Sequence, residues 1–502
     1  MVHSECESEK TASHENLRFR MSRRTWKIAV FLAWLVLLGL LVTRDLFVPV
    51  MDRGEEAVLQ KARQEKYYGI WFNGQRIGYV VEIMRPRGEK FILDQEAHLL
   101  LNVLDTTQPV DMRVRATLTG SLRLLDFTFR FTSPFSTMEA EGTVEGNRVS
   151  FRLDTGQTTI SDTVSLPEPP LLAINDRGYL LDRLTGPGQK IRVPSFDPLS
   201  LSARESIITY HGREKIVVRG RLQQLHRFSE AAAGMRTSFW TDEAGKVIME
   251  ESPVGFKFIA EPEFRARDIV RPGTELLSAV AVPFTGDLPA PGAGSVTYRI
   301  TMPPDLDFEL AGGRQTVEGG LLRIIRELMP ERFGHTGPEN CGDLRYLEPS
   351  RYVQADNGEI IAQAAAIVGP ETDPAARVRL LARWVHAKLE KRPVIGLPDA
   401  LTTLKSRRGD CNEHASLFAA LARALGIPTA IATGVTLQHD AFYYHAWNEV
   451  CLGGQWYSLD TTTDQLPADL YHIRFARGDI EQQLMIGGLL GNLEIEIVPP
   501  PE

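Results

Sequence analysis

The sequence predicts an α+β protein of several domains. Three observations support this prediction: apolar and polar residues alternate over much of the N-terminal half, helical periodicity begins after Asp373, and one long apolar run lies near the N-terminus. A chain of 502 residues is too long for one ordinary hydrophobic core, so we expect two to four domains. Hydrophobic residues make up 43% and charged residues 24%, which is ordinary for a globular protein.

The apolar run extends from Ile28 to Val42 and contains no charged residue. With its flanking residues it approaches the lower length limit of a membrane-spanning helix, about 17 residues. Charges after the run are mixed, whereas those just before it are basic: Arg18, Arg20, Arg23, Arg24 and Lys27. This asymmetry places the N-terminus in the cytoplasm. A cleaved signal peptide is the alternative, but the following stretch TRDLFVPVMD has no small-x-small cleavage site. We therefore expect a cytoplasmic tail at 1–27 and an uncleaved signal anchor, a transmembrane helix, at 28–43.

From about Tyr67 to Ile269 the residues alternate between apolar and polar, which is typical of antiparallel strands with one buried face. Asn73-Gly74 is a strong type I′ hairpin signal between two such runs. We expect a large antiparallel all-β domain at 67–270, built either as a curved open sheet or as a sandwich. It contains no catalytic constellation, so its expected role is either support or the binding of a ligand or partner.

A stretch rich in proline, alanine and glycine, Asp287–Gly294, is typical of a linker. Alternation then resumes briefly and predicts a small β module at 295–345. In the remaining domain, 350–502, Asp373 is a good helix N-cap and Pro374 suits the first helical position. One face of that helix is apolar: Val378, Leu381, Val385 and Leu389.

A second helix is predicted in the run from Arg408 to Pro428, with Cys411 in its first turn. Its apolar stripe consists of Leu417, Phe418, Leu421, Ala422 and Leu425. The unpaired N–H groups and the positive dipole end at a helix start favour a thiolate over a thiol. The same N–H groups can hold a developing oxyanion. An isolated cysteine at this position would more often be a small buried apolar residue.

A predicted β-hairpin supplies two further candidate groups. Its first strand begins at His445, its return strand ends at Asp460, and Gly453-Gly454 is predicted to form a two-residue turn. Pairing Leu452 with Gln455 across this turn makes Asp460 a diagonal neighbour of His445 on the same face, on the order of 7 Å away. A carboxylate at that place would fix the tautomer of the imidazole and stabilise its charged form.

Three blocks in this order resemble a known family: GDCNEHASLFAALARALGIPT, HAWNEV and WYSLDTTTD. The chain from about Asp373 to Thr463, the expected core 373–463, resembles the transglutaminase-like core of the papain-like thiol-enzyme superfamily. The resemblance implies a papain-like fold with a catalytic triad of Cys411 as nucleophile, His445 as base and Asp460 as its partner. The sequence departs from the common pattern in the residue after the aspartate, where a proline is more usual. The β-rich remainder resembles the N-terminal regions of bacterial membrane-anchored proteins of this type.

These observations predict an extracytoplasmic cysteine peptidase, amidase or acyltransferase on the periplasmic side of a bacterial inner membrane. The thiol would attack a peptide or amide bond and form a thioester. Water would then give hydrolysis and a substrate amine would give transamidation; the residues leave both open, and the expected setting slightly favours hydrolase activity. The alternative is a catalytically inert transglutaminase-like scaffold whose β domain binds a cell-envelope protein partner.

Several classes of partner and cofactor are not expected. The net charge is −8, and this balance gives no reason to expect a nucleic-acid partner, because phosphate binding needs clustered lysine and arginine. The four cysteines, Cys6, Cys341, Cys411 and Cys451, form no CxxC pair, and no EF-hand loop is present in the sequence, so neither metal nor cofactor is predicted. Nothing in the sequence brings Cys341 close to Cys451, and we predict that they do not form a disulfide.

The neighbours of the candidate triad have expected roles of their own. Glu413 should cap the helix locally, and His414 should point away from Cys411 because adjacent helical residues do not share a face. Trp447 and Trp456 are expected in the core. The aromatic run Phe442–Tyr444 would either line the acyl-donor groove or anchor a loop.

Overall fold

The computed structural model describes residues 64–499, apart from 104–105, 173–176, 178, 199, 233–234, 268–279, 291, 305, 334–340 and 342. The predicted cytoplasmic tail at 1–27 and signal anchor at 28–43 therefore lie outside the described residues. Among the residues that are described, we find no helix with both the length and the apolar character needed to cross a membrane.

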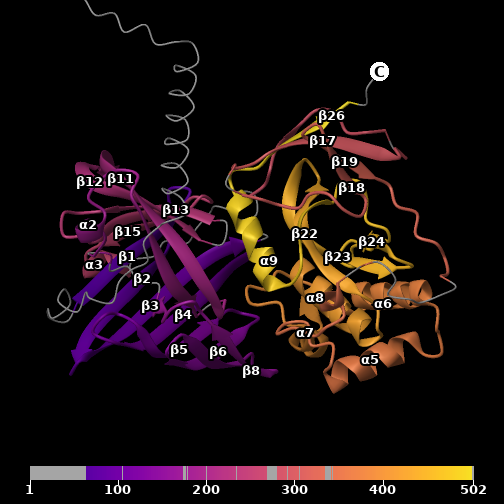
Figure 1. The fold of residues 1–502 in the computed structure, drawn as a ribbon, viewed down its shortest axis with the longest axis horizontal. Helices are drawn as coiled ribbons and strands as arrows, with labels where there is room; N and C mark the ends of the chain where they lie inside the picture. Colours follow the sequence, from indigo (N-terminus) through magenta and orange to yellow (C-terminus); the bar gives the residue numbers. More distant parts are fainter. Residues whose placement is uncertain are drawn as a thin grey trace, which may run out of the picture. The chain divides into compact units, whose positions relative to one another are not determined.

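The N-terminal part of the described chain forms one 15-stranded sheet (Figure 1). Its order is β8-β7-β6-β5-β4-β3-β2-β1-β15-β14-β13-β12-β11-β10-β9, so the chain runs from the middle to one edge and later returns from the other. All neighbours pair antiparallel except β9 and β10. The strands are β1 (Gln64–Phe72), β2 (Gln75–Arg87), β3 (Lys90–Val103), β4 (Thr106–Leu118), β5 (Leu124–Thr132), β6 (Thr137–Glu145), β7 (Arg148–Asp154), β8 (Thr159–Ser165), β9 (Leu171–Leu172), β10 (Lys190–Asp197), β11 (Ser202–Val218), β12 (Arg221–Ala232), β13 (Met235–Thr241), β14 (Val247–Glu251) and β15 (Phe256–Glu261), with short helices α2 (Tyr179–Arg183) and α3 (Glu263–Ala266).

The predicted alternation decides which side of this sheet is buried. In β5, Phe127 is buried whereas the next residue, Thr128, is exposed. Phe127 packs against Phe196 of β10, with 5.2 Å between ring centroids, so the two arms of the sheet share one core. The Asn73-Gly74 turn is also confirmed: both residues have positive φ, 47° and 77°, as a type I′ turn requires.

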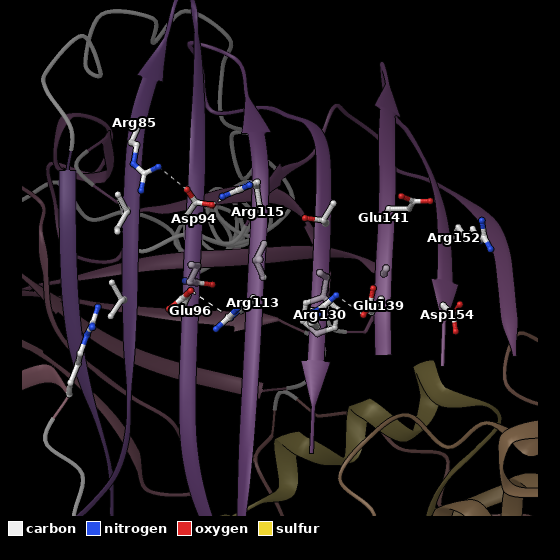
Figure 2. A pocket seen from close by; sticks show the side chains of 18 residues that line it. Arg85, Asp94, Glu96, Arg113, Arg115, Arg130, Glu139, Glu141, Arg152 and Asp154 are labelled. Carbon is white, nitrogen blue, oxygen red and sulfur yellow. Dashed lines mark hydrogen bonds and ion pairs between the residues drawn. The ribbon is translucent and has the colours of Figure 1, made fainter. Parts of the chain in front are cut away.

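The outer face of β2 to β7 carries charged side chains in cross-strand pairs (Figure 2). Asp94 lies between Arg85 at 3.4 Å and Arg115 at 2.6 Å, and Arg130 pairs with Glu139 at 2.7 Å. A hollow of about 780 Å³ lies over these residues, and its walls include neither cysteine nor histidine. Because the two signs alternate and pair within the sheet, this surface favours neither a cationic nor an anionic ligand, and exposed pairs of this kind contribute about 0–1 kcal/mol each.

A second, five-stranded sheet includes a short strand before the expected linker, Phe284–Thr285, and strands after it. The predicted alternation is confirmed here, since Val296 and Tyr298 are buried in its core. The C-terminal strand pairs with the strand that directly follows the linker, for example Ile497 with Tyr298. The small β module is therefore not confined to the expected 295–345, because the end of the chain completes it. In the order β16-β26-β17-β19-β18 the strands are β16 (Phe284–Thr285), β26 (Glu494–Val498), β17 (Ser295–Thr301), β19 (Leu321–Ile325) and β18 (Gln315–Glu318).

The predicted helix-containing part packs three helices around α8, which in turn lies on β22 and β23 (Figure 1). Asp373 caps α6 as expected, since its side chain accepts a hydrogen bond from the backbone N–H of Ala376 at 3.0 Å. The four-stranded sheet has the order β24-β23-β22-β25. The elements are η1 (Leu344–Tyr346), α5 (Gly358–Val368), α6 (Pro374–Lys388), β20 (Glu390–Lys391), α7 (Ala400–Ser406), β21 (Arg408–Gly409), α8 (Cys411–Ala424), β22 (Thr429–Gln438), β23 (Ala441–Leu452), β24 (Gln455–Leu459), β25 (Ile473–Arg477), α9 (Ile480–Met485) and η2 (Ile486–Leu489).

Cys341 and Cys451 form a disulfide, with 6.1 Å between their Cα atoms, so the prediction that they stay apart is wrong. The two residues are 110 positions apart in the sequence. A long-range contact holds an earlier residue, Glu327, against β24: its side chain accepts a hydrogen bond from the backbone N–H of Ser458 at 3.0 Å. No local pattern encodes such a contact. Among the described residues, Cys411 is left as the free cysteine.

Candidate active site

Helix α8 begins at Cys411, as predicted, because a capping box forms at its start. The Asp410 side chain accepts a hydrogen bond from the N–H of Asn412 at 3.0 Å, and Glu413 reaches back to the N–H of Asp410 at 2.9 Å. A side chain at position 409 would collide with Glu413, so Gly409 leaves the room that this contact needs. The expected role of Glu413 as a local cap is therefore confirmed.

Strand β23 holds the sulfur end of α8 close to His445. The side-chain amide of Asn448 donates to the carbonyl of Ala415 in α8 at 3.0 Å. The backbone N–H of Ala446, the residue after His445, donates to the Cys411 sulfur. The nucleophile candidate therefore lies against the strand beside the candidate base.

His445 and Asp460 are in direct contact. The Nε2–H of His445 donates to Oδ2 of Asp460 at 2.9 Å, and their side chains are 4% and 0% exposed. The expected pairing of Leu452 with Gln455 is present, but β24 ends at Leu459. Asp460 therefore reaches His445 from just beyond the paired strand. The contact leaves Nδ1 of His445 as the ring nitrogen available for proton exchange.

A second histidine, absent from the sequence prediction, shares the same carboxylate. His472 Nε2 lies 3.2 Å from Oδ2 of Asp460, and its Nδ1 lies 2.8 Å from Oδ1 of Asp469. His472 directly precedes β25, which approaches β22 so closely that a side chain in place of Gly434 would collide with the backbone of Ile473. The only sequence signal was the three-residue spacing of Asp469 and His472.

His445, Asp460 and His472 present ligand atoms within 4.8 Å of one another, so within the described part of the chain they are a group that could hold a metal ion. Each close contact is already a hydrogen bond from a ring N–H to a carboxylate oxygen. The other oxygen of Asp460 accepts from the N–H of Thr462 at 2.7 Å. The three side chains are thus satisfied without a cation, and we interpret them as a hydrogen-bonded network.

Burial and hydrogen bonding oppose each other within this network. Burial alone would raise the pKa of Asp460, but hydrogen bonds from His445 and His472 outweigh it and lower that pKa. Burial alone would lower the pKa of His472, but hydrogen bonds to Asp460 and Asp469 outweigh it and raise that pKa. The structure therefore favours a carboxylate at Asp460 and a protonated ring at His472.

Burial opposes the thiolate that the helix start was expected to favour at Cys411. Burial raises the pKa of the Cys411 thiol well above its ordinary value, the Asp410 carboxylate raises it further, and the N–H of Ala446 only partly offsets them. The sequence prediction considered the electrostatic effect of the helix N-terminus but not the burial of the thiol.

The raised pKa gives a testable pH dependence. We expect the alkylation rate of Cys411 by iodoacetamide to keep rising through the pH at which a free cysteine is half ionised, about 8.5, because the thiolate is the reactive species. Mass spectrometry of the Cys411 peptide at a series of pH values measures this rate, and Cys411→Ala identifies the peptide. A rate that is already constant between about pH 6 and 7 would contradict the direction of the shift.

Cys411 and His445 line one pocket of about 320 Å³. Among the described residues no hydrogen bond joins the Cys411 sulfur to the His445 ring; the two residues share the lining of this pocket. Residues from the loop at 396–398 and from α9 and η2 form other walls, which shows that the C-terminal stretch borders the site. The remaining lining residues are Gly396, Leu397, Pro398, Asn412, Thr433, Tyr444, Gln483, Leu484 and Ile486.

The other sequence candidates divide between pocket and core. Tyr444 lines the pocket, whereas Phe442 is fully buried in the core of the small sheet. Trp447 is buried, as predicted, but Trp456 is only partly buried. The ring of His414 is buried and donates to the carbonyl of Asp410 at 2.7 Å. The His414 side chain therefore binds the N-cap residue of its own helix.

Comparison with known structures gives low similarity. The chain resembles a candidate cysteine protease from Cytophaga hutchinsonii at 18% identity and TM-score 0.27, covering 43% of this chain and 82% of that one. It resembles a β-barrel-like protein of a domain of unknown function from Brucella abortus at 10% identity and TM-score 0.31, covering 39% and 94%. It also resembles a candidate protease from Parabacteroides distasonis at 11% identity and TM-score 0.20, covering 65% and 64%. No conclusion about function rests on TM-scores this low.

The comparison with curated proteins found no match. Residues 361–461 match the transglutaminase-like superfamily. This range includes Cys411, His445 and Asp460, together with the helix and strands that position them. The chain therefore contains a transglutaminase-like domain at residues 361–461.

Proposed function

We propose that this protein is an extracytoplasmic thiol enzyme that cleaves or transfers the acyl group of peptide or amide substrates through Cys411. The observation that supports it best is the shared pocket. Cys411 and His445 both line it, and Asp460 accepts a hydrogen bond from the His445 ring. The match to the transglutaminase-like superfamily supports a thiol enzyme in general.

In the proposed reaction, Nδ1 of His445 takes the thiol proton as the Cys411 sulfur attacks the substrate carbonyl carbon. The backbone N–H of Cys411, at the start of α8, is suited to stabilise the oxyanion of the tetrahedral intermediate. The C–N bond then breaks, His445 gives its proton to the leaving amine, and a thioester remains on Cys411. Attack by water, again with His445 as base, releases an acid and the free thiol; attack by an amine instead gives a new amide.

The walls of the pocket support an uncharged acyl group as the substrate. None of the lining residues is aspartate, glutamate, lysine or arginine. Burying a charged substrate group there without a partner would be costly. At about 320 Å³ the pocket is at the small end of the range for ligand sites, roughly 300–1,000 Å³. A neutral peptide or amide segment fits both constraints.

The Cys341–Cys451 disulfide supports an extracytoplasmic location, because disulfides persist in oxidising compartments. The predicted signal anchor at 28–43 would keep this body on the periplasmic side of a bacterial inner membrane. In that setting peptide or protein substrates of the cell envelope are within reach, and the large β domain would serve as a support or bind an envelope protein.

Trapping of the acyl-enzyme tests this proposal. We expect a neutral N-acyl p-nitroanilide to add its acyl mass to Cys411 in intact-protein and peptide mass spectrometry, and hydroxylamine to remove it, as it does a thioester. Cys411→Ala should lose the adduct. Amidase and transamidase activities that persist in Cys411→Ala would refute the proposal. An intact Cys411 that never acylates would instead favour the inert scaffold with a binding β domain.

A further inference from the structure

We infer that His472 is a positioning residue of this site, held as an imidazolium between Asp460 and Asp469. It fixes the Asp460 carboxylate against His445 and places a positive charge beside that carboxylate. This inference rests on the proposed function, because His472 acts on the chemistry only through Asp460 and His445.

Hydrogen-bond accounting supports the charged ring. An ionised carboxylate only accepts hydrogen bonds, so a nitrogen beside it must carry a hydrogen. His472 Nε2 lies 3.2 Å from Oδ2 of Asp460, and His472 Nδ1 lies 2.8 Å from Oδ1 of Asp469. Both ring nitrogens must therefore be protonated, which is the imidazolium form. The hydroxyl of Thr436, at 3.5 Å from Nδ1, lies at the limit of hydrogen bonding and does not replace Asp469.

The surroundings of His472 can hold this charge. The side chain is 1% exposed, and a buried charge persists only when it is paired. Its two carboxylate partners supply the pairing from the loop before β25. The other charged group beside it is Arg314, which donates to the backbone carbonyl of His472 at 3.1 Å and lies 4.0 Å from Glu327. Because Arg314 binds the backbone carbonyl of His472 and not its side chain, the imidazole ring of His472 contacts Asp460 and Asp469.

The same geometry couples His472 to the candidate base. The ring centroids of His445 and His472 are 5.8 Å apart, and both rings donate to Oδ2 of Asp460. Trp447 stacks on His445 at 6.2 Å and packs edge-on against His472 at 5.1 Å, which keeps water from screening the pair. The charge on His472 therefore acts at close range on the carboxylate that both rings share.

His472→Gln separates this charge effect from simple packing, because the glutamine amide can still donate to Asp460 but carries no charge. We expect the acid limb of the pH profile of kcat/KM to move to higher pH by about one unit, because removing a positive charge from the site favours protonation of the groups around it. His439→Gln is the matched control: His439 is exposed in the β22–β23 turn and should leave the limb unchanged. A loss of amplitude without a shift of the limb would overturn the positioning role.

Histidine NMR on the wild-type protein tests the charge without relying on the variant. With selectively ¹⁵N-labelled histidine, we expect one ring to keep both nitrogens protonated at about pH 8, where an ordinary histidine with a pKa of about 6.5 is neutral. Its signal should be missing in His472→Gln. A neutral His472 ring at that pH would overturn the inference even if Cys411 is catalytic. If the ring is charged but Cys411 never acylates, the proposed function fails and the positioning role with it, while the charge assignment stands.

Discussion

Asp460→Asn is expected to lower kcat by on the order of 10⁴-fold, the loss that follows when a triad aspartate becomes an amide. One oxygen of Asp460 accepts from His445, from His472 and from the hydroxyl of Thr463 at 2.6 Å. An asparagine whose oxygen kept these three donors would turn its NH₂ group towards the N–H of Thr462, which needs an acceptor, and in either orientation the negative charge beside the His445 ring is lost. Steady-state or single-turnover acylation of Cys411 measures the effect.

The matched control is Asp464→Asn, since Asp464 is exposed and lies four positions further along the chain. We expect this variant to retain wild-type kcat. Because Asp460 lies behind the imidazole and not in the wall of the pocket, KM should change far less than kcat in Asp460→Asn. A variant that folds, by circular dichroism, and loses less than about tenfold in kcat would show that His445 does not depend on Asp460 for its orientation.

The parts of the fold that the sequence predicted are those encoded by neighbouring residues. Gly453 and Gly454 both have positive φ, 59° and 79°, which the tight turn between β23 and β24 requires, and glycine adopts such angles at no steric cost. Asp373 and Asp410 cap the helices that begin immediately after them. Each of these signals acts within four residues, so the local sequence contains it completely.

In the candidate site, too, the sequence predicted only what neighbouring residues encode. The start of α8 and the order of the three blocks indicated Cys411, His445 and Asp460 as candidates. The state of the thiol depends on the surfaces around it, and these come from distant parts of the chain, since Leu484 of α9 lines the same pocket. His472 was missed for a related reason: it reaches Asp460 only because β25 pairs with β22 and not with its sequence neighbour β24.

The C-terminal strand β26 shows the same limit at the level of domains. Its alternating residues indicate a strand, but nothing local says that it pairs with β17, almost two hundred residues earlier. Strand pairing depends on the assembled hydrophobic face, here formed by Tyr298 and Ile497 among others. The alternation of residues therefore predicted strands after the linker, but not that β26 pairs with them.

Removal of the Cys341–Cys451 disulfide is expected to be the largest single loss of stability in the described part of the chain. A disulfide limits the freedom of the unfolded chain, and losing one typically costs about 2–4 kcal/mol, towards 5 kcal/mol for a loop of about a hundred residues. With 110 positions between the cysteines, this bond belongs to the long-loop class. We expect Cys341→Ala to lower the Tm by about 5–15 °C, measured by differential scanning calorimetry.

The reductant provides the internal control for this prediction. Tris(2-carboxyethyl)phosphine should lower the Tm of the wild type to that of Cys341→Ala and should leave the variant unchanged, because only the wild type has the bond to lose. Cys451 lies at the end of the strand that carries His445, so reduction is also expected to slow acylation of Cys411. If Cys341 reacts with a thiol reagent in the native, unreduced protein, the bond is not formed, and the support it lends to an oxidising compartment is lost with it.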